Sequence, residues 1–252
     1  MASIPRPTLE EAARAWLDTK PDGARRSAQL RAALEDFVGK RFRGAATELR
    51  AVHDLRQRLL EDQRPLDSLH EAATGPWDSQ TLGAAASHSA PPDQGRLLFH
   101  LTRSLAPNQV LELGTNIGIS AAYLALGQRY GDGGTVTSVE ASGVRRLEAR
   151  RIHTELGVTD VDLVEGYFDD VLPSLLDRLG RVDLAFLDGN HQLDATVRYF
   201  EMLAPQITAG GMMVLDDIRW SEGMLEAWNR IVARPEASTT VDLGRTGLVI
   251  VA

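Results

Sequence analysis

One segment of this chain predicts its architecture: Val110-Leu111-Glu112-Leu113-Gly114-Thr115-Asn116-Ile117-Gly118-Ile119-Ser120. An apolar run ends at a turn bounded by two glycines, and an alanine-rich helical pattern follows it. A strand, a tight turn and a helix N-terminus bring backbone N–H groups to the carboxyl edge of a parallel sheet, where small ligands bind. The segment therefore predicts a ligand site at this turn.

Apolar runs recur along the rest of the chain, with helical patterns between them. The runs are residues 110–113, 135–139, 161–164, 182–187, 212–215 and 248–251. Strands that alternate with helices are typical of a doubly wound, mostly parallel sheet. Two final strands, Thr239–Leu243 and Thr246–Ala252, are separated only by Gly244-Arg245, which indicates an antiparallel hairpin. We therefore predict an α/β fold with a seven-stranded, mostly parallel sheet.

The first third of the chain has a different character. Residues 8–70 are rich in Ala, Leu, Arg and Glu, and their spacing predicts two or three helices. Residues 74–95 carry turn signals such as Thr74-Gly75-Pro76, which predict a long irregular connection, and an amphipathic helix is expected over Asp93–Leu105. We predict a helical cap with its connecting loop over residues 1–86 and an α/β domain over residues 87–252.

Composition excludes several classes of protein and site. The chain has 252 residues, a net charge of −8 and no cysteine, so disulfides and thiolate metal sites are excluded. An arginine cluster at positions 145, 146, 150 and 151 falls on a helix that also carries Glu148, and we expect a solvated face there rather than a nucleic-acid site. No apolar run approaches the roughly 20 residues of a membrane span, and no signal pattern is seen, so we expect a cytoplasmic protein.

The turn after residue 113 does not suit a dinucleotide. Asn116 stands in place of the second glycine of G-x-G-x-x-G, and no G-K-[ST] phosphate loop exists in the chain. Glu112, at the strand end, would repel a phosphate and suits a cationic or hydroxyl-bearing ligand. Glu140 ends the second strand, where its carboxylate can accept hydrogen bonds from two ribose hydroxyls. These two carboxylates favour a nucleoside with a positively charged tail, which describes S-adenosylmethionine (SAM).

This pattern resembles the class I SAM-dependent methyltransferases, above all the small O-methyltransferases of the catechol and caffeoyl-CoA type. The resemblance covers about residues 87–252 and rests on Glu112–Ser120, Glu140 and Glu165-Gly166. It implies a Rossmann-like methyltransferase fold and a loop, Ser87–Ala90, that closes over SAM. It also implies cofactor contacts from the turn, the ribose-binding carboxylate and the adenine-flanking pair: Glu112, Gly114, Thr115, Asn116, Gly118, Ser120, Glu140, Gly166, Tyr167 and Asp188. Tyr167 and Phe168 equally suit a packing role, and a fold that binds another nucleotide stays the alternative.

Acidic residues close the fourth and fifth predicted strands. Asp188 follows the fourth strand, and Asp216-Asp217 follows the fifth. Neighbouring parallel strands end side by side, so we expect these carboxylates to converge, which is unfavourable unless a cation neutralises them. Oxygen ligands point to Mg²⁺, or to Ca²⁺ or Mn²⁺. The resemblance implies a metal here too, and the Asp-Asp pair is similar to that of the macrolide-sugar O-methyltransferases; helix caps or solvated loop residues are the alternative.

A histidine stands where the catechol-type enzymes carry a basic lysine, three residues after Asp188. It is His191, and the only lysines of the chain are Lys20 and Lys40. Histidine titrates near neutral pH and suits proton removal from an activated hydroxyl, although a structural role is the alternative. We expect His191 and Asp188 to be catalytic, and Trp77, Arg219 and Trp220 are candidates for the border of the acceptor pocket.

The sequence thus predicts a metal-dependent transfer of a methyl group from SAM to a hydroxyl of a small molecule, such as a natural product, sugar or phenol. A metal-independent N- or carboxylate-methyltransferase of the same fold is the nearest alternative. A SAM-binding partner protein without catalytic activity is the alternative from another class. By analogy, the N-terminal helices predict a homodimer.

Overall fold

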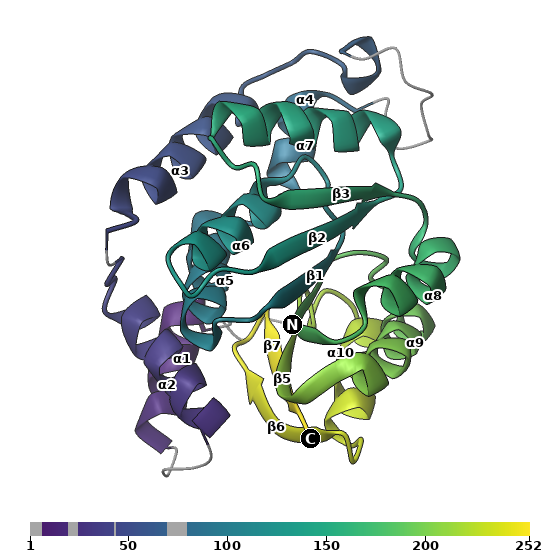
Figure 1. Cartoon of the computed structure of the whole chain (residues 1–252). Coiled ribbons are helices and arrows are strands. Elements are labelled where there is room, and N and C mark those ends of the chain that lie inside the picture. The colour runs from purple at the N-terminus through teal and green to yellow at the C-terminus, as the bar shows by residue number, and fades with distance from the viewer. Residues whose placement is uncertain (1–6, 20–24, 43, 70–79) are drawn as a thin grey trace, which may run out of the picture.

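The computed structural model describes residues 7–19, 25–42, 44–69 and 80–252. At its centre lies a seven-stranded sheet in the order β3-β2-β1-β4-β5-β7-β6 (Figure 1). Neighbouring strands are parallel from β3 to β5, and β7 runs antiparallel to both β5 and β6. The predicted fold class and the C-terminal hairpin are therefore confirmed. The strands are β1 (Gln109–Leu113), β2 (Thr135–Glu140), β3 (Val161–Glu165), β4 (Val182–Leu187), β5 (Ile207–Leu215), β6 (Ala237–Asp242) and β7 (Gly247–Val251).

Helices cover both faces of this sheet (Figure 1). On one face, side chains from α5, α6 and α7 share a core with Val110, Leu184 and Val214 of the strands. On the other face, α8, α9 and α10 pack against the alternate strand residues, such as Leu111 and Ala185. These helices are α5 (Pro92–Leu105), α6 (Ile119–Arg129), α7 (Gly143–Glu155), α8 (Phe168–Leu179), α9 (Leu193–Leu203) and α10 (Glu222–Val232).

The N-terminal part of the chain is helical, as predicted. Its elements are α1 (Leu9–Thr19), α2 (Arg25–Val38), α3 (Ala46–Leu60), a short 3-10 turn (Leu66–Ser68) and α4 (Leu82–Ser87). Helix α4 corrects the prediction of an irregular connection over residues 74–95: Thr81 accepts a hydrogen bond from the Ala84 N–H at 3.1 Å and so caps this helix. Trp77 and the turn signals at residues 74–76 lie outside the described residues.

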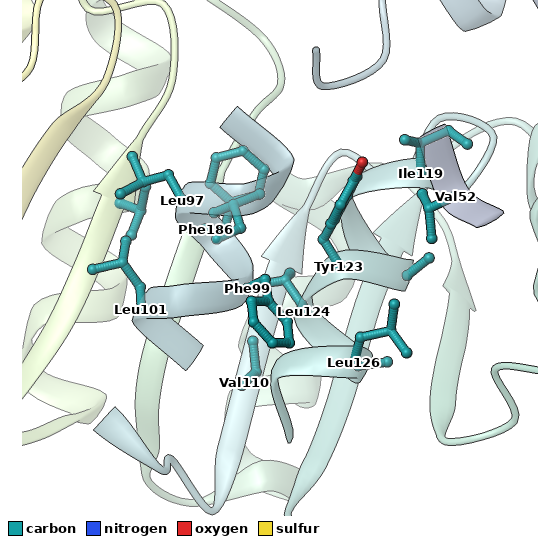
Figure 2. Close-up of a cluster of buried hydrophobic side chains, with 14 of the residues drawn as sticks. Val52, Leu97, Phe99, Leu101, Val110, Ile119, Tyr123, Leu124, Leu126 and Phe186 are labelled. Carbon is teal, nitrogen blue, oxygen red and sulfur yellow. The ribbon is translucent and has the colours of Figure 1, made fainter. Parts of the chain in front are cut away.

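The N-terminal helices and the sheet share one hydrophobic core. Leu30, Phe37 and Val52 belong to the same buried cluster as Phe99 of α5 and Tyr123 of α6. Figure 2 shows Val52 of α3 beside side chains of α6. The boundary predicted after residue 86 falls within α4. No helix in the described part of the chain is both long and apolar enough to cross a membrane.

Candidate active site

A cavity of about 570 Å³ opens at the carboxyl edge of the sheet. Much of its wall comes from segments at the ends of four neighbouring strands: 167–169 after β3, 140–142 at the end of β2, 114–116 after β1 and 188–191 after β4. His88 and Ser89, from the predicted closing loop, complete the wall. Because the strand order is β3-β2-β1-β4, these segments follow one another along a single edge. The sequence predicted a ligand site at this edge of the sheet, and the cavity lies at the same edge.

Gly114 brings the ends of β1 and β4 into direct contact. Its φ is +110°, and a Cβ at this position would lie 2.0 Å from the Asp188 carbonyl oxygen. The Asp188 N–H in turn donates to the Leu113 carbonyl at 2.9 Å. Only glycine has both the conformation and the space that this approach requires. The glycine therefore sets the position of Asp188 at the cavity wall.

Asn116 connects three elements around the cavity. It has a φ of +48°, a left-handed conformation that asparagine tolerates better than most residues. Its amide group donates to the Ala85 carbonyl at 2.8 Å and to Ser89 Oγ at 3.1 Å. Its side-chain oxygen accepts from Arg145 Nη1 at 2.8 Å. Asn116 thus holds the α4–α5 connection and the start of α7 against the turn.

Glu140 lies at the end of β2 with its carboxylate fixed by backbone N–H groups. Asn116 N–H donates to one oxygen at 2.7 Å, and Ser142 N–H donates to the other at 3.0 Å. A carboxylate oxygen accepts more than one hydrogen bond, so both oxygens keep acceptor capacity towards the cavity that Glu140 lines. This carboxylate can therefore receive the two hydroxyls of a ribose.

The predicted cofactor residues divide into two groups. Seven of them line the cavity: Gly114, Thr115, Asn116, Ser120, Glu140, Tyr167 and Asp188. Glu112 does not line the cavity, because the alternation of side chains along β1 turns it to the face of the sheet under α6. There it is fully buried and accepts a hydrogen bond from Ser138. Gly118 and Gly166 also lie outside the lining.

Gly118 and Gly166 allow close packing around the cavity. A Cβ on Gly118 would lie 2.6 Å from His153 Nε2, and a Cβ on Gly166 would lie 2.3 Å from Val171 Cγ1. Both glycines have positive φ, +85° and +149°. They let α7 approach α6 and let α8 begin close to the end of β3, which shapes the cavity.

The predicted catalytic residues come together at the β4 end of the cavity. His191 Nε2 lies 3.6 Å from Asp188 Oδ1 and 4.0 Å from Asp217 Oδ2. Burial raises the pKa of Asp188 well above its usual range, and the nearby carboxylates of Asp216 and Glu112 add to this rise. Asp188 and His191 both line the cavity. The expectation that the acidic strand ends converge is met.

The cation beside these acids is an arginine of the chain. Arg245 Nη2 donates to Asp216 Oδ2 at 2.7 Å, and Arg245 Nε donates to Asp216 Oδ1 at 3.1 Å. Arg245 Nε also lies 3.1 Å from Asp217 Oδ1. In the described part of the chain, no group of three or more His, Asp or Glu side chains is placed to hold a metal ion. The arrangement of the predicted ligands therefore does not suit a metal ion; these ligands are Asp188, Asp216 and Asp217.

Two residues that line the cavity, Arg145 and Tyr199, were not predicted from the sequence as site residues. Arg145, expected on a solvated face, lines the cavity and binds Asn116 and Gln80, whose Oε1 lies 3.1 Å from Arg145 Nη2. Tyr199 of α9 also lines the cavity and accepts from Asn190 at 3.1 Å. The only signal for Arg145 was its place three residues after Ser142, which caps α7. No local pattern pointed to Tyr199.

Two candidates for the acceptor border, Arg219 and Trp220, do not line this cavity. Trp220 is 71% exposed, and its backbone N–H donates to the Asp217 carbonyl at 2.9 Å. Arg219 pairs with Asp242 of β6. Trp228 of α10 is 5% exposed and packs against Gly247.

The segments that form this edge of the sheet lie in the part of the chain that matches known proteins. Residues 111–218, from β1 to just after β5, match a family described as a methyltransferase domain. The chain resembles class I O-methyltransferases. It is 31% identical to a catechol O-methyltransferase of Mycobacterium tuberculosis over 134 residues, 52% of this chain and 58% of that protein. It is 30% identical to tricin synthase 2 of Oryza sativa subsp. japonica over 139 residues, 52% of this chain and 45% of that protein. The chain spans about half the length of the curated relatives it matches.

Solved structures show the same fold. An O-methyltransferase of Bacillus cereus in complex with SAH (S-adenosylhomocysteine) superposes with a TM-score of 0.59 at 21% identity, over 87% of this chain and 97% of that one. A SAH-bound methyltransferase of Podospora anserina superposes with a TM-score of 0.64 at 16% identity, over 93% of this chain and 99% of that one. The predicted resemblance to the class I O-methyltransferase fold is confirmed.

Proposed function

We propose that this protein transfers a methyl group from SAM to a hydroxyl of a small-molecule acceptor. The observation that carries the proposal is the order of groups along the sheet edge: Tyr167 after β3, Glu140 after β2, the Gly114 turn after β1 and His191 after β4. This order matches SAM read from the adenine through the ribose to the sulfur, which carries both the methionine chain and the methyl group. The methyltransferase-domain match and the SAH-bound structural neighbours support it.

The cavity residues provide a partner for each part of SAM. Tyr167, which is 62% exposed, offers a ring face to the adenine. Glu140 receives the ribose hydroxyls, and Asp188 lines the wall of the cavity beside His191. Backbone N–H groups at the start of α6 suit the methionine carboxylate, because a helix N-terminus attracts anions. SAM supplies, when bound, an electrophilic methyl group on a positively charged sulfur.

His191 is the proposed general base. As the methyl carbon forms its bond to the acceptor oxygen, its bond to sulfur breaks, and the sulfur keeps the electron pair. The hydroxyl proton passes to His191 Nε2. Asp188 lies 3.6 Å from this nitrogen. The carboxylate of Asp217 lies 4.0 Å from it and stabilises the positive charge that the imidazole then carries. Proximity and orientation within the cavity supply the remaining acceleration.

Calorimetry with SAH tests the cofactor assignment. We expect Glu140→Gln to weaken SAH binding by about tenfold to a hundredfold, because the charged acceptor of two hydroxyls is lost. Glu165→Gln is the matched control: Glu165 ends the next strand, outside the cavity lining, and pairs with Arg146 at 2.9 Å. Equal SAH affinity of the Glu140→Gln variant and the unmodified protein would refute the ribose assignment.

Transfer from methyl-labelled SAM to a panel of hydroxyl, amine and carboxylate acceptors tests the reaction. His191→Gln is expected to bind SAH normally and to lose transfer to hydroxyls. Transfer to amines or carboxylates alone would favour the alternative methyltransferase class. SAH binding with no transfer to any acceptor would favour a partner protein without activity.

Metal activation is not part of this proposal, because Arg245 holds the carboxylates that were expected to bind the ion. The homodimer, the cytoplasmic location and the division into a cap and a catalytic domain stay predictions.

A further inference from the structure

Asp216 is the most enclosed carboxylate at the acidic end of the site. Its side chain has 0% exposure, whereas the side chain of its partner Arg245 is 40% exposed. Two guanidinium nitrogens of Arg245 bind the two oxygens of Asp216, at 2.7 and 3.1 Å. In addition, Thr246 Oγ1 lies 3.4 Å from Asp216 Oδ1. Such a bidentate ion pair is strong and directional, and it occupies the Asp216 oxygens that a metal ion would need.

The backbone holds Arg245 in this place. The turn between β6 and β7 is closed by a hydrogen bond from Leu243 N–H to the Thr246 carbonyl at 2.9 Å. Gly244, with a φ of +84°, makes the turn possible. The Arg245 carbonyl then accepts from the Ile218 N–H at 3.0 Å, which attaches the turn to the segment after β5. Since β5 and β7 are paired, with Leu215 opposite Gly247, the arginine has a fixed register relative to Asp216.

Asp217 extends the same pair towards the cavity. Its φ is +52°, a conformation that costs free energy for a residue other than glycine. Its Oδ1 lies 3.1 Å from Arg245 Nε, and its Oδ2 lies 4.0 Å from His191 Nε2. One guanidinium is thus shared by two carboxylates, one of which also faces the proposed base.

Electrostatics agree with this geometry. Partial burial lowers the pKa of Arg245, but the hydrogen bonds and charges of Asp216 and Asp217 outweigh it, and the net pKa is raised. The guanidinium therefore stays charged. A divalent ion beside Asp216 would have to displace it or share the carboxylates with a like charge, and both are unfavourable.

We propose that Arg245 is the resident cation of this site: it occupies the place expected of a divalent metal ion, and the protein works without one. Arg245 is a positioning residue, because it contacts the carboxylates around His191 and not the reacting atoms. The structural part of the proposal concerns Asp216, Asp217 and Arg245 alone, whereas the part about turnover rests on the proposed function.

One chemical consequence follows for the acceptor. With no metal ion to lower the pKa of its hydroxyl, the proton must pass directly to His191. The rate is then expected to rise steadily as the pKa of the acceptor hydroxyl falls. A metal ion bound to the hydroxyl oxygen would itself lower the pKa of that hydroxyl.

Mn²⁺ binding measured by electron paramagnetic resonance on the full chain is the first test. We expect the unmodified protein to bind no Mn²⁺ at this site, and any methyl transfer to be unchanged by EDTA. Mn²⁺ binding that is lost in Asp216→Asn would overturn the proposal. So would transfer that EDTA abolishes and Mg²⁺ restores. This measurement does not depend on whether any Arg245 variant folds.

Removal of the guanidinium is the second test. Arg245→Met frees the oxygens of Asp216 and Asp217 beside Asp188, and we expect Mn²⁺ affinity to rise at least about tenfold as their charge becomes available. The gain should disappear in Arg245→Met combined with Asp216→Asn. Arg245→Lys, which keeps the charge, should show no gain. Arg230→Met, which removes the exposed Arg230–Glu226 pair of α10, is the control for the change in net charge.

A folded Arg245→Met variant without any gain in Mn²⁺ affinity would overturn the claim that Arg245 keeps an ion out. These outcomes differ from a failure of the proposed function, which would appear as absent SAH binding or absent transfer. Mn²⁺ binding to the apo protein reports on Arg245 in either case.

Discussion

Glu112 shows at the scale of one residue how burial changes a carboxylate. It is fully buried beneath the Gly114 turn, next to Ser138 and Thr115, whose hydroxyls lie 2.5 Å apart. Burial raises its pKa from 4.5 to about 7, although hydrogen bonds from Ser120 and Ser138 oppose the shift. The carboxylate of Glu140 adds to the rise. Glu112 therefore changes charge near neutral pH in the folded state.

This shift predicts a pH dependence of stability. A carboxyl group whose pKa is higher in the folded state keeps its proton there while the unfolded chain loses it, so stability falls as pH rises from about 4.5 to about 7. The loss amounts to about 3 kcal/mol at most, and it is complete above pH 7. We expect Glu112→Gln to lose less stability than the unmodified protein between pH 5 and pH 8 in urea unfolding. Parallel pH curves for the two proteins would contradict the assignment.

The packing of α5 against α6 depends on glycine at the scale of the element. A Cβ on Gly127 of α6 would lie 2.6 Å from Thr102 Cβ and 2.9 Å from the Phe99 carbonyl of α5. A Cβ on Gly95 of α5 would lie 2.2 Å from the ring of Tyr123. Each helix thus has a glycine at the point of contact. This close approach places the N-terminus of α6 beside the cavity.

We expect Gly127→Ala to destabilise the protein by about 1–3 kcal/mol, because the added methyl group meets backbone that cannot move without separating the helices. Gly223→Ala is the matched control on α10, where the nearest atom to a Cβ lies 3.7 Å away. In that helix, alanine should be neutral or stabilising by up to about 1 kcal/mol. Urea unfolding of the two variants measures the difference, and equal midpoints would argue against a close α5–α6 contact.

At the scale of the whole molecule, the N-terminal helices complete the core of the sheet domain. Leu34 and Phe37 of α2 and Leu55 of α3 are buried in the same cluster as Leu98 of α5. Arg103 of α5 pairs with Asp36 of α2 at 3.0 Å, and both side chains are largely buried. Without α1–α3, one side of α5 and part of α6 would expose this apolar surface to water.

We therefore expect a chain of residues 80–252 to fail to unfold cooperatively in calorimetry, or to aggregate, because the apolar surface that these helices cover would be exposed and proteins have a margin of stability of only about 5–15 kcal/mol. The full chain should show one cooperative transition. A cooperative transition of the shorter chain near the melting temperature of the full chain would instead support the predicted division into a cap and an independent domain.

Much of the fold and part of the site were predictable from sequence. The alternation of strands and helices identified the parallel sheet, and the hairpin around Gly244-Arg245 was marked by its turn residues. The glycine turn and the residues after each strand were predictable because parallel strands end at one edge. Asp188, His191 and Glu140 were predicted in this way, and all three line the cavity.

What the sequence alone determined is therefore local: which segments form strands and helices, and which residues stand at the ends of strands. Only the tertiary structure decided that Arg245 faces Asp216 across the β5–β7 pair, that Arg145 turns to Asn116 and that Glu112 is enclosed. These contacts join residues 29 positions apart in the first two cases. They depend on strand order and helix packing, which bring together groups that no local periodicity relates.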